Sequence, residues 1–311
     1  MGGPHPHRRG PPRAPWSTMN HSENVAALRG VLQLSPTDPI HESRETEFFE
    51  GQSQFKPDGR VFGGQVLAQC VMAGGLTVAD DRPIHSLHGY FLRTGDATRP
   101  IVFGVENLRD GGSFSARRVH AYQDGQPIMS VMSSFQLVQE GYDHGDDFPA
   151  GMPDPEDCPE IKDLVGSVDL PHVQEWLVKR PFDVRPVEPS LYLAHQGDEV
   201  SHQHVWIRAS AEFPADPLLN AAALAYASDF NLLEPAMRRH GLAWQEPGLR
   251  LASLDHAMWW HRPIRVDEWM LYSQNSPSAE GGRALGAGRI FARDGQLLAT
   301  VAQQGMMRVK R

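Results

Sequence analysis

The 311-residue sequence predicts an α+β protein built from two similar halves, each with one enclosed helix and an antiparallel sheet. Three observations support this prediction. Residues 61–78 and 217–233 are apolar on nearly every side and have the length of helices, so other structure must surround them. Short motifs occur twice in the same order. In each half an Asp-Gly pair lies between alternating apolar runs, as in a β-hairpin.

The composition is that of an ordinary globular protein, with 40% hydrophobic and 22% charged residues. The net charge of −9 argues against a nucleic-acid partner. Cys70 and Cys158 provide neither a disulfide framework nor a paired metal motif, so we expect a reducing, cytoplasmic location. The second apolar segment contains Asn220 and Asp229 and is too short to span a bilayer, so stable membrane insertion is not expected.

Composition also predicts the domain boundaries. Residues 1–31 begin with a stretch rich in Pro, Gly, Arg and His and without a long apolar run, which predicts a flexible or disordered tail rather than a secretory signal. The first half is expected at 32–139 and the second at 196–311. Residues 140–195 are expected to form a linker and connector, because 140–160 are acidic and rich in proline.

Within each half, the helix is expected to precede a series of strands. The strands expected in the first half are residues 102–108, 117–122 and 128–136. The strands expected in the second half are residues 266–273, 287–292 and 298–307. The connector contains a weak helical pattern at 161–178 and a stretch at 180–189 that its prolines should keep extended.

Three pairs of motifs indicate an internal duplication. The pairs are Ser86-Leu87 with Ser253-Leu254, Arg99-Pro100-Ile101 with Arg262-Pro263-Ile264, and Asp124-Gly125-Gln126 with Asp294-Gly295-Gln296. Each match alone is too short to be decisive. Three matches in order, at similar separations and each downstream of an apolar helix, favour a duplicated unit.

Asp229 distinguishes the two halves. It is expected on one helical face with Ala222, Ala225, Tyr226 and Leu233, where a carboxylate is costly unless it is hydrogen-bonded or chemically useful. The first apolar helix has no acidic residue. Two interpretations stay open at this point. Asp229 is either a structural accident or the sign that one repeat kept its chemistry while the other became a scaffold.

Familiar site motifs are absent from the sequence. The run Gly111-Gly112-Ser113-Phe114-Ser115 lacks the last glycine of a nucleophile elbow, and no P-loop or HExxH motif occurs. The histidine pairs His85/His88 and His256/His261 lie on predicted strands without acidic or thiol companions at ligand spacing, so no metal site is expected. Structural or substrate-lining roles are the better interpretation of these histidines.

Six longer runs allow a comparison with known families. They are residues 60–65 (RVFGGQ), 85–93 (HSLHGYFLR), 108–118 (LRDGGSFSARR), 226–229 (YASD), 253–263 (SLDHAMWWHRP) and 303–308 (QQGMMR). From about residue 32 to the C-terminus, the chain resembles the acyl-CoA thioesterase II family. The resemblance implies a double hotdog fold, in which each of two repeats wraps an antiparallel sheet around a long helix. It also implies hydrolysis of acyl-CoA to a free acid and CoA, without a metal or other cofactor.

The resemblance also implies the catalytic residues, which match Asp229, Ser253 and Gln303. Ser253 stands where some members have Thr and keeps the hydroxyl group. Gln304 adjoins Gln303, but strand alternation lets only one of them face the site, and Gln303 lies two residues before Gly305 as in the family pattern. A partly desolvated Asp229 would act as general base or orient a water, with Ser253 and Gln303 fixing that water. A covalent acyl-enzyme at Ser253 is the less favoured route, because no histidine base is expected beside it.

Expectations about ligands and partners complete the prediction. The residues expected to contact an acyl-CoA substrate are Gly63, Gly64, His85, His88, Arg93, Arg109, Arg117 and Arg118. A duplicated chain already resembles a dimer, and the edges of its antiparallel sheet invite further pairing, so a homodimer or homotetramer is the expected assembly. Two alternatives remain, a non-enzymatic acyl-CoA or lipid-binding protein and a hotdog enoyl-CoA hydratase that would use His88 or His256 with an acid.

Overall fold

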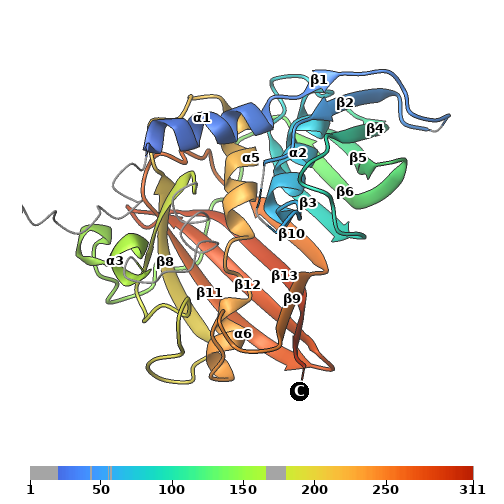
Figure 1. Cartoon of the computed structure of the whole chain (residues 1–311). Helices are drawn as coiled ribbons and strands as arrows, with labels where there is room; N and C mark the ends of the chain where they lie inside the picture. The colour runs from blue at the N-terminus through green and yellow to red at the C-terminus, as the bar shows by residue number, and fades with distance from the viewer. Residues whose placement is uncertain (1–19, 43, 55, 57, 166–179, 311) are drawn as a thin grey trace, which may run out of the picture.

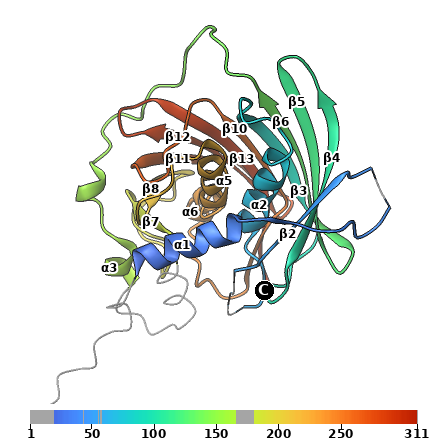
Figure 2. The same ribbon diagram turned by 90° about the horizontal axis from the view of Figure 1, so that it is seen from above.

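Two central helices and one curved sheet make up the core of the protein. The computed structural model describes residues 20–42, 44–54, 56, 58–165 and 180–310 (Figure 1). Helices α2 (Gly63–Gly75) and α5 (Pro217–Ser228) lie side by side and the sheet curves around both (Figure 2). Most residues of both helices are buried, which explains why their sequences are apolar on every side. No helix in this described part of the chain has the length and apolar character needed to cross a membrane.

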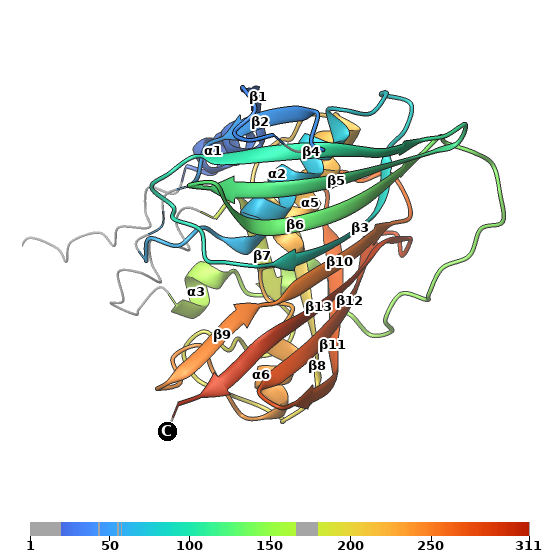
Figure 3. The ribbon, with the colours of Figure 1, turned by 90° about the vertical axis from the view of Figure 1, so that its right-hand side faces the viewer.

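The described residues form one continuous antiparallel sheet of thirteen strands. The strands of the first half are β1 (Ser35–Pro36), β2 (Glu47–Gly51), β3 (Ile84–Phe91), β4 (Ile101–Asp110), β5 (Phe114–Gln123) and β6 (Gln126–Gln136). Those of the second half are β7 (Phe182–Pro186), β8 (His202–Ala209), β9 (Leu249–Ser253), β10 (Asp255–Trp260), β11 (Met270–Glu280), β12 (Arg283–Ala292) and β13 (Leu297–Val309). The halves join where β3 pairs with β10 (Figure 3). The predicted α+β architecture of two repeats is confirmed.

Both predicted hairpins are present, but their turns differ. β5 and β6 are joined by Asp124 and Gly125, whose φ angles of 50° and 71° fit a two-residue turn. β12 and β13 have a longer connection, and of its Asp-Gly pair only Gly295 has a positive φ, of 97°. The predicted strand pairing is therefore confirmed in both halves, whereas the two-residue turn is confirmed only in the first.

The predicted N-terminal boundary at residue 32 is wrong, because part of the expected tail is helical. Helix α1 (His21–Leu32) begins where the Asn20 side chain accepts a hydrogen bond from the Glu23 backbone N–H at 3.2 Å. Val25, Leu28 and Leu32 are buried, and α1 packs against α2 and α5. An apolar stripe at helical spacing therefore holds this segment on the core. Residues 1–19 of the predicted tail lie outside the described residues.

The acidic linker packs against the outside of the second half. Asp143 pairs with Arg262, Asp146 pairs with Arg289, and Phe148 contacts the rings of Trp206 and Phe291. Further along lie a short 3₁₀ helix, η2 (Pro155–Asp157), and helix α3 (Ile161–Val165). The rest of the predicted helical pattern, residues 166–179, lies outside the described residues.

The second half begins earlier than predicted. Strand β7 falls inside the predicted connector and pairs with β8, so the sheet of this half starts before residue 196. The prolines at 181 and 186 that indicated an extended segment flank or end this strand, which lies at the edge of the sheet as proline requires.

The second apolar segment is broken where the sequence predicts one continuous helix. α5 ends at Ser228, and α6 (Glu234–Arg239) starts after a short loop. Pro235, in the first turn of α6, has no N–H and cannot donate to the Asn231 carbonyl as a continuous helix requires. Asp229 therefore lies at the C-terminal end of α5 and not on the face of a longer helix, which corrects the prediction.

Candidate active site

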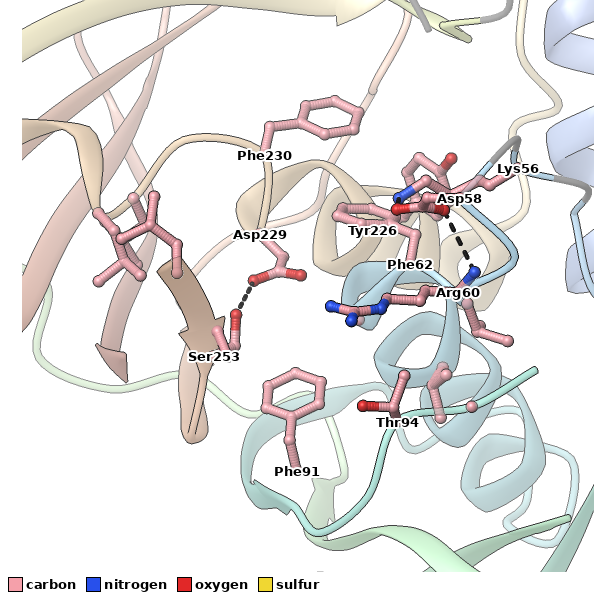
Figure 4. Close-up of a pocket in the computed structure, with 18 of the residues that line it drawn as sticks. Lys56, Asp58, Arg60, Phe62, Phe91, Thr94, Tyr226, Asp229, Phe230 and Ser253 are labelled. Carbon is pink, nitrogen blue, oxygen red and sulfur yellow. Dashed lines mark hydrogen bonds and ion pairs between the residues drawn. The ribbon is translucent and has the colours of Figure 1, made fainter. Parts of the chain in front are cut away.

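Asp229 extends from the end of α5 toward the start of α2 (Figure 4). Its Oδ2 atom lies 2.8 Å from the position that a Cβ atom would take at Gly63, so no larger residue fits there without movement. The backbone N–H of Gly64 donates to the carboxylate. The glycines at the helix start, which we expected to contact substrate, therefore allow a close approach of Asp229, and the free N–H at the helix N-terminus stabilises its charge.

Ser253 and Gln303 complete a hydrogen-bonded trio with Asp229. The Ser253 hydroxyl, at the end of β9, donates to Asp229 Oδ1 at 3.1 Å. The Gln303 side-chain amide, on β13, donates to Ser253 Oγ at 2.8 Å. Gln303 is 2% exposed and faces inward, whereas Gln304 does not line the cavity described below. The structure thus brings together three residues that are far apart in the sequence.

The surroundings of Asp229 raise the pKa of its carboxyl group from 3.8 to about 6. Burial is the main cause, because it removes water from the charged form. Hydrogen bonds from Gln303, Ser253 and Gly64 act in the opposite direction and lower the pKa, as does the charge of Lys56. The group is therefore ionised at neutral pH but binds a proton more readily than an ordinary aspartate, as a general base must.

A cavity of about 850 Å³ opens beside the trio and is lined by residues of both halves. Asp229, Ser253 and Gln303 all form part of its wall. Lys56 and Arg60, from the segment before α2, and Thr94, just after β3, contribute polar and charged groups to the lining. Figure 4 shows all three on the same side of Asp229. Residues near α6 and β9 contribute apolar side chains, namely Leu232, Leu233, Trp244 and Leu251. A ligand with both an anionic and an apolar part fits such a lining.

Few of the residues expected to contact substrate lie at this cavity. Gly63 and Arg93 line it, and Gly64 donates to Asp229. The predicted residues that do not line it are His85, His88, Arg109, Arg117 and Arg118. Several of these have structural partners: His85 bonds to Ser134 at 2.9 Å, and Arg118 pairs with Glu106. These residues do not line the cavity, and we do not assign substrate contacts to them.

Other cationic side chains at the cavity were not singled out from the sequence. Lys56 and Arg60 precede α2, and Arg180 precedes β7. The Arg180 guanidinium carbon lies 4.1 Å from the centre of the Phe230 ring, next to Asp229 in the chain. Of these three residues, only Arg60 could have been predicted at the cavity from the sequence, because it lies just before the glycine-containing start of a helix, where anions commonly bind.

Gly286 explains why the loop after α5 can reach the sheet. It lies on β12 directly opposite Gln303 on β13. A Cβ atom at this position would be 2.2 Å from the Leu232 carbonyl oxygen, far closer than real contacts allow. The loop that begins with Asp229 therefore packs on the backbone of β12 at Gly286, which allows the carboxylate to lie beside Ser253 and Gln303.

In the first half, Arg117 occupies the position that corresponds to Gly286. It lies on β5 opposite Ser133 of β6, as Gly286 lies opposite Gln303. Its side chain is buried and donates to Thr77 Oγ1 at 2.8 Å and to the Thr77 carbonyl at 2.9 Å, just beyond the end of α2. Arg117 thus holds in place the segment after α2, and this half has neither the acid nor the amide of the second. The asymmetry between the repeats extends from Asp229 to the sheet beneath it.

The histidines of the hydratase alternative do not reach the cavity. His256, on β10, is 1% exposed, and its Nδ1 atom lies 2.5 Å from Gln303 Oε1, behind the trio. His88 contacts the Trp259 ring, with the ring centres 5.1 Å apart, and is exposed. Within the described ranges of the chain, no histidine lines the cavity beside Asp229. The acid–histidine pair that a hydratase needs is therefore not found at this site.

Comparisons with known proteins identify the family of the chain. The family model described as "Acyl-CoA thioesterase" matches residues 174–306, and the one described as "Acyl-CoA thioesterase N-terminal domain" matches residues 52–136. The chain is 36% identical to acyl-CoA thioesterase 2 of Haemophilus influenzae, over 92% of this chain and 99% of that protein. It is 37% identical to human acyl-coenzyme A thioesterase 8, over 90% of this chain and 88% of that protein.

Solved structures give the same result. An acyl-CoA thioesterase II from Mycobacterium marinum is 42% identical, with a TM-score of 0.73 and coverage of 91% of this chain and 98% of that chain. A protein from Alicyclobacillus acidocaldarius described as having a hot dog fold shares 19% identity and a TM-score of 0.72, with coverage of 92% of this chain and 99% of that chain, which concerns the fold alone. The predicted fold and the predicted family are both confirmed, and the chain belongs to the acyl-CoA thioesterase II family, with a double hotdog fold.

Proposed function

We propose that this protein hydrolyses fatty acyl-CoA thioesters to free acid and CoA. One observation carries the proposal: Asp229, Ser253 and Gln303 form a hydrogen-bonded trio in the wall of a cavity with both cationic and apolar lining. Lys56, Arg60 and Arg93 supply positive charge for the phosphates of CoA. The apolar side chains near α6 and β9 accommodate the acyl chain. The names of the relatives support the same activity.

The chemistry that fits the trio is direct attack by water. Asp229 accepts a proton as the water oxygen bonds to the thioester carbon. Ser253 and Gln303 position the water, and donors at fixed positions of this kind typically contribute about a hundredfold in rate. When the tetrahedral intermediate breaks its carbon–sulfur bond, the proton held by Asp229 passes to the departing thiolate. Free acid and CoA leave, and Asp229 is ionised again.

Ser253 is not the nucleophile in this scheme. Its hydroxyl donates to Asp229 and accepts from Gln303, and none of the histidines in the described residues lines the cavity beside it as the base of a serine nucleophile. We expect no acyl-serine during turnover. Quenching the reaction in acid and treating the protein with hydroxylamine should release no acyl hydroxamate, whereas a stoichiometric release that disappears in Ser253→Ala would establish the covalent route.

The proposed activity is tested by measuring free thiol from a series of acyl-CoA substrates, from short chains to palmitoyl-CoA. Hydrolysis predicts thiol release at a rate proportional to enzyme. A non-enzymatic acyl-CoA carrier would bind the same molecules, as seen by calorimetry, without thiol release. Loss of enoyl absorbance from an unsaturated acyl-CoA, without thiol release, would instead indicate hydration.

The pH dependence of hydrolysis should reflect Asp229. Because the base acts in its ionised form and its pKa is raised to about 6, kcat/KM should be constant above about pH 7 and fall as the pH drops through 6. The expected fall is about tenfold per pH unit. An ordinary aspartate would keep full activity to about pH 5. A profile that is flat down to pH 5 in the stable enzyme would therefore contradict the assignment.

We also propose a homodimer or homotetramer in the cytoplasm. The outer face of the sheet exposes Tyr90 on β3 and Met132 on β6, which are 63% and 51% accessible, and contact with a second copy would cover them. Multi-angle light scattering of the intact protein and of a Tyr90→Arg variant tests the assembly. The cytoplasmic location is supported by Cys70 and Cys158, which are both buried free thiols. Fractionation of the source cells tests it.

A further inference from the structure

We infer that His256 is a positioning residue for this hydrolysis, because it holds the Gln303 amide with its NH₂ group turned toward Ser253 and Asp229. The inference rests on the proposed function and extends the site to a residue outside the cavity. His256 touches neither water nor substrate in this scheme. It acts through Gln303.

A continuous series of hydrogen bonds connects His256 to the carboxylate. Its Nδ1 atom lies 2.5 Å from Gln303 Oε1, and Gln303 Nε2 lies 2.8 Å from Ser253 Oγ. Ser253 Oγ lies 3.1 Å from Asp229 Oδ1. On its other side, His256 Nε2 lies 3.0 Å from the hydroxyl of Ser228, the last residue of α5. His256 thus connects Ser228, which directly precedes Asp229 in the chain, to the side-chain amide of Gln303.

The orientation of the Gln303 amide, with its NH₂ group toward Ser253, sets the direction of this series. Burial lowers the pKa of His256 to about 4, so at neutral pH the ring is neutral and has one N–H donor and one acceptor nitrogen. Gln303 Oε1 can only accept, so Nδ1 must carry the hydrogen. Nε2 is then an acceptor and faces the Ser228 hydroxyl, whose one hydrogen is shared between Nε2 at 3.0 Å and the Ala225 carbonyl oxygen at 2.8 Å. From His256 Nδ1 onward every donor points toward Asp229, whose carboxylate is the final acceptor.

The opposite orientation of the Gln303 amide would disturb the trio. If the amide turned by half a rotation, Oε1 would face Ser253 Oγ and the NH₂ group would face the histidine. Ser253 has one hydrogen and would then choose between two acceptors, Gln303 Oε1 and Asp229. The amide donor would be lost from the side that holds the water. A histidine with hydrogen on Nδ1 prevents this rotation, because two donors would then face each other.

A merely structural role for His256 makes different predictions, and side-chain replacements separate the two. Asn carries its amide nitrogen near the place of imidazole Nδ1, so it can keep the donor to Gln303. Gln reaches the place of Nε2 and can bond Ser228 but not Gln303 in the same way. Leu keeps much of the volume and removes both contacts. If His256 only fills the core, the losses should follow stability and not the presence of the Nδ1 donor.

The experiment measures kcat and KM for thiol release in the intact protein, with melting temperature as the control for folding. His256→Leu and His256→Gln should lower kcat about 10- to 100-fold with KM changed less than about threefold, since a transition-state donor is misplaced while binding is kept. His256→Asn should recover most of the lost kcat. Equal losses in Asn and Gln variants of equal stability would overturn the inference, as would normal kcat in His256→Leu.

A double-mutant cycle and a spectrum make the test independent of any one variant. In a Gln303→Ala background, His256→Leu should have almost no further effect on kcat, because the group through which it acts is gone. Additive losses would contradict the proposal. ¹⁵N NMR of the histidine side chains, with the His256 signal assigned from the Asn variant, should show hydrogen on Nδ1. Hydrogen on Nε2 would overturn the inference even if hydrolysis is absent, whereas absence of thiol release from the wild type would refute the proposed function.

Discussion

Asp229→Asn should reduce kcat for thioester hydrolysis by at least about 100-fold while leaving the protein folded. The amide keeps the size of the side chain and one acceptor oxygen for the Ser253 hydroxyl, but it cannot take a proton from water. KM for acyl-CoA should change little, because the cationic and apolar parts of the cavity are untouched. Thiol release measured on the purified variant, freed of wild-type contamination, tests this expectation.

The same substitution should leave the protein at least as stable as the wild type at neutral pH. The Asp229 carboxyl has a pKa of about 6 in the folded protein and 3.8 in the unfolded chain, so the folded state binds the proton more tightly. The stability that protonation provides is complete below about pH 4 and is lost as the pH rises through 6. At pH 7 the buried charge therefore costs about 1–3 kcal/mol, which a neutral amide avoids.

Two outcomes would contradict this assignment. Near-normal turnover by a folded Asp229→Asn protein would remove Asp229 from the mechanism. A large fall in melting temperature at pH 7 would show that the carboxylate is a structural requirement and that the loss of activity says little about chemistry. Asp294→Asn, the same change at an exposed turn outside the cavity lining, is a matched control and should keep normal activity.

The sequence was sufficient to predict the repeats because their helices are enclosed on all sides and their hairpins carry turn residues. It was also sufficient for Asp229, since an acid in an apolar segment is conspicuous in one repeat and absent from the other. Ser253 and Gln303 followed from the family resemblance, and the structure brings both to Asp229. That the three act in catalysis stays a prediction.

What the sequence could not supply is the register between strands far apart in the chain. Nothing local distinguishes His256, which lies behind Gln303, from His88, which is exposed on the adjacent strand. Likewise the sequence could not show that Arg117 is buried, because its partner Thr77 lies in another element, and Arg117 was therefore predicted to contact the substrate. The break after Ser228 was missed because the apolar pattern continues through the loop, where tertiary contacts and Pro235 override helical periodicity.

Gly286→Ala should lower kcat about 10- to 100-fold through a position that contacts neither substrate nor water. The added methyl would meet the Leu232 carbonyl oxygen at 2.2 Å and the Leu232 side chain at 3.0 Å. Because the first of these atoms belongs to the backbone, the whole loop after α5 must move. A displacement of about 1 Å is enough to misalign a general base from the atom it serves.

Gly112→Ala is the matched control, since nothing lies within 4 Å of a Cβ atom there, and it should retain normal turnover. Thermal unfolding and substrate binding distinguish a shifted base from a collapsed fold. If only the base has moved, the Gly286→Ala protein should keep a cooperative thermal transition and bind acyl-CoA while its kcat falls. Wild-type kcat in that variant would mean that the loop tolerates movement and that the sheet beneath it does not fix Asp229. A loss confined to kcat would extend the functional difference between the repeats from Asp229 and Gln303 to this glycine, because the corresponding Arg117 leaves the first half no room for a loop that carries an acid.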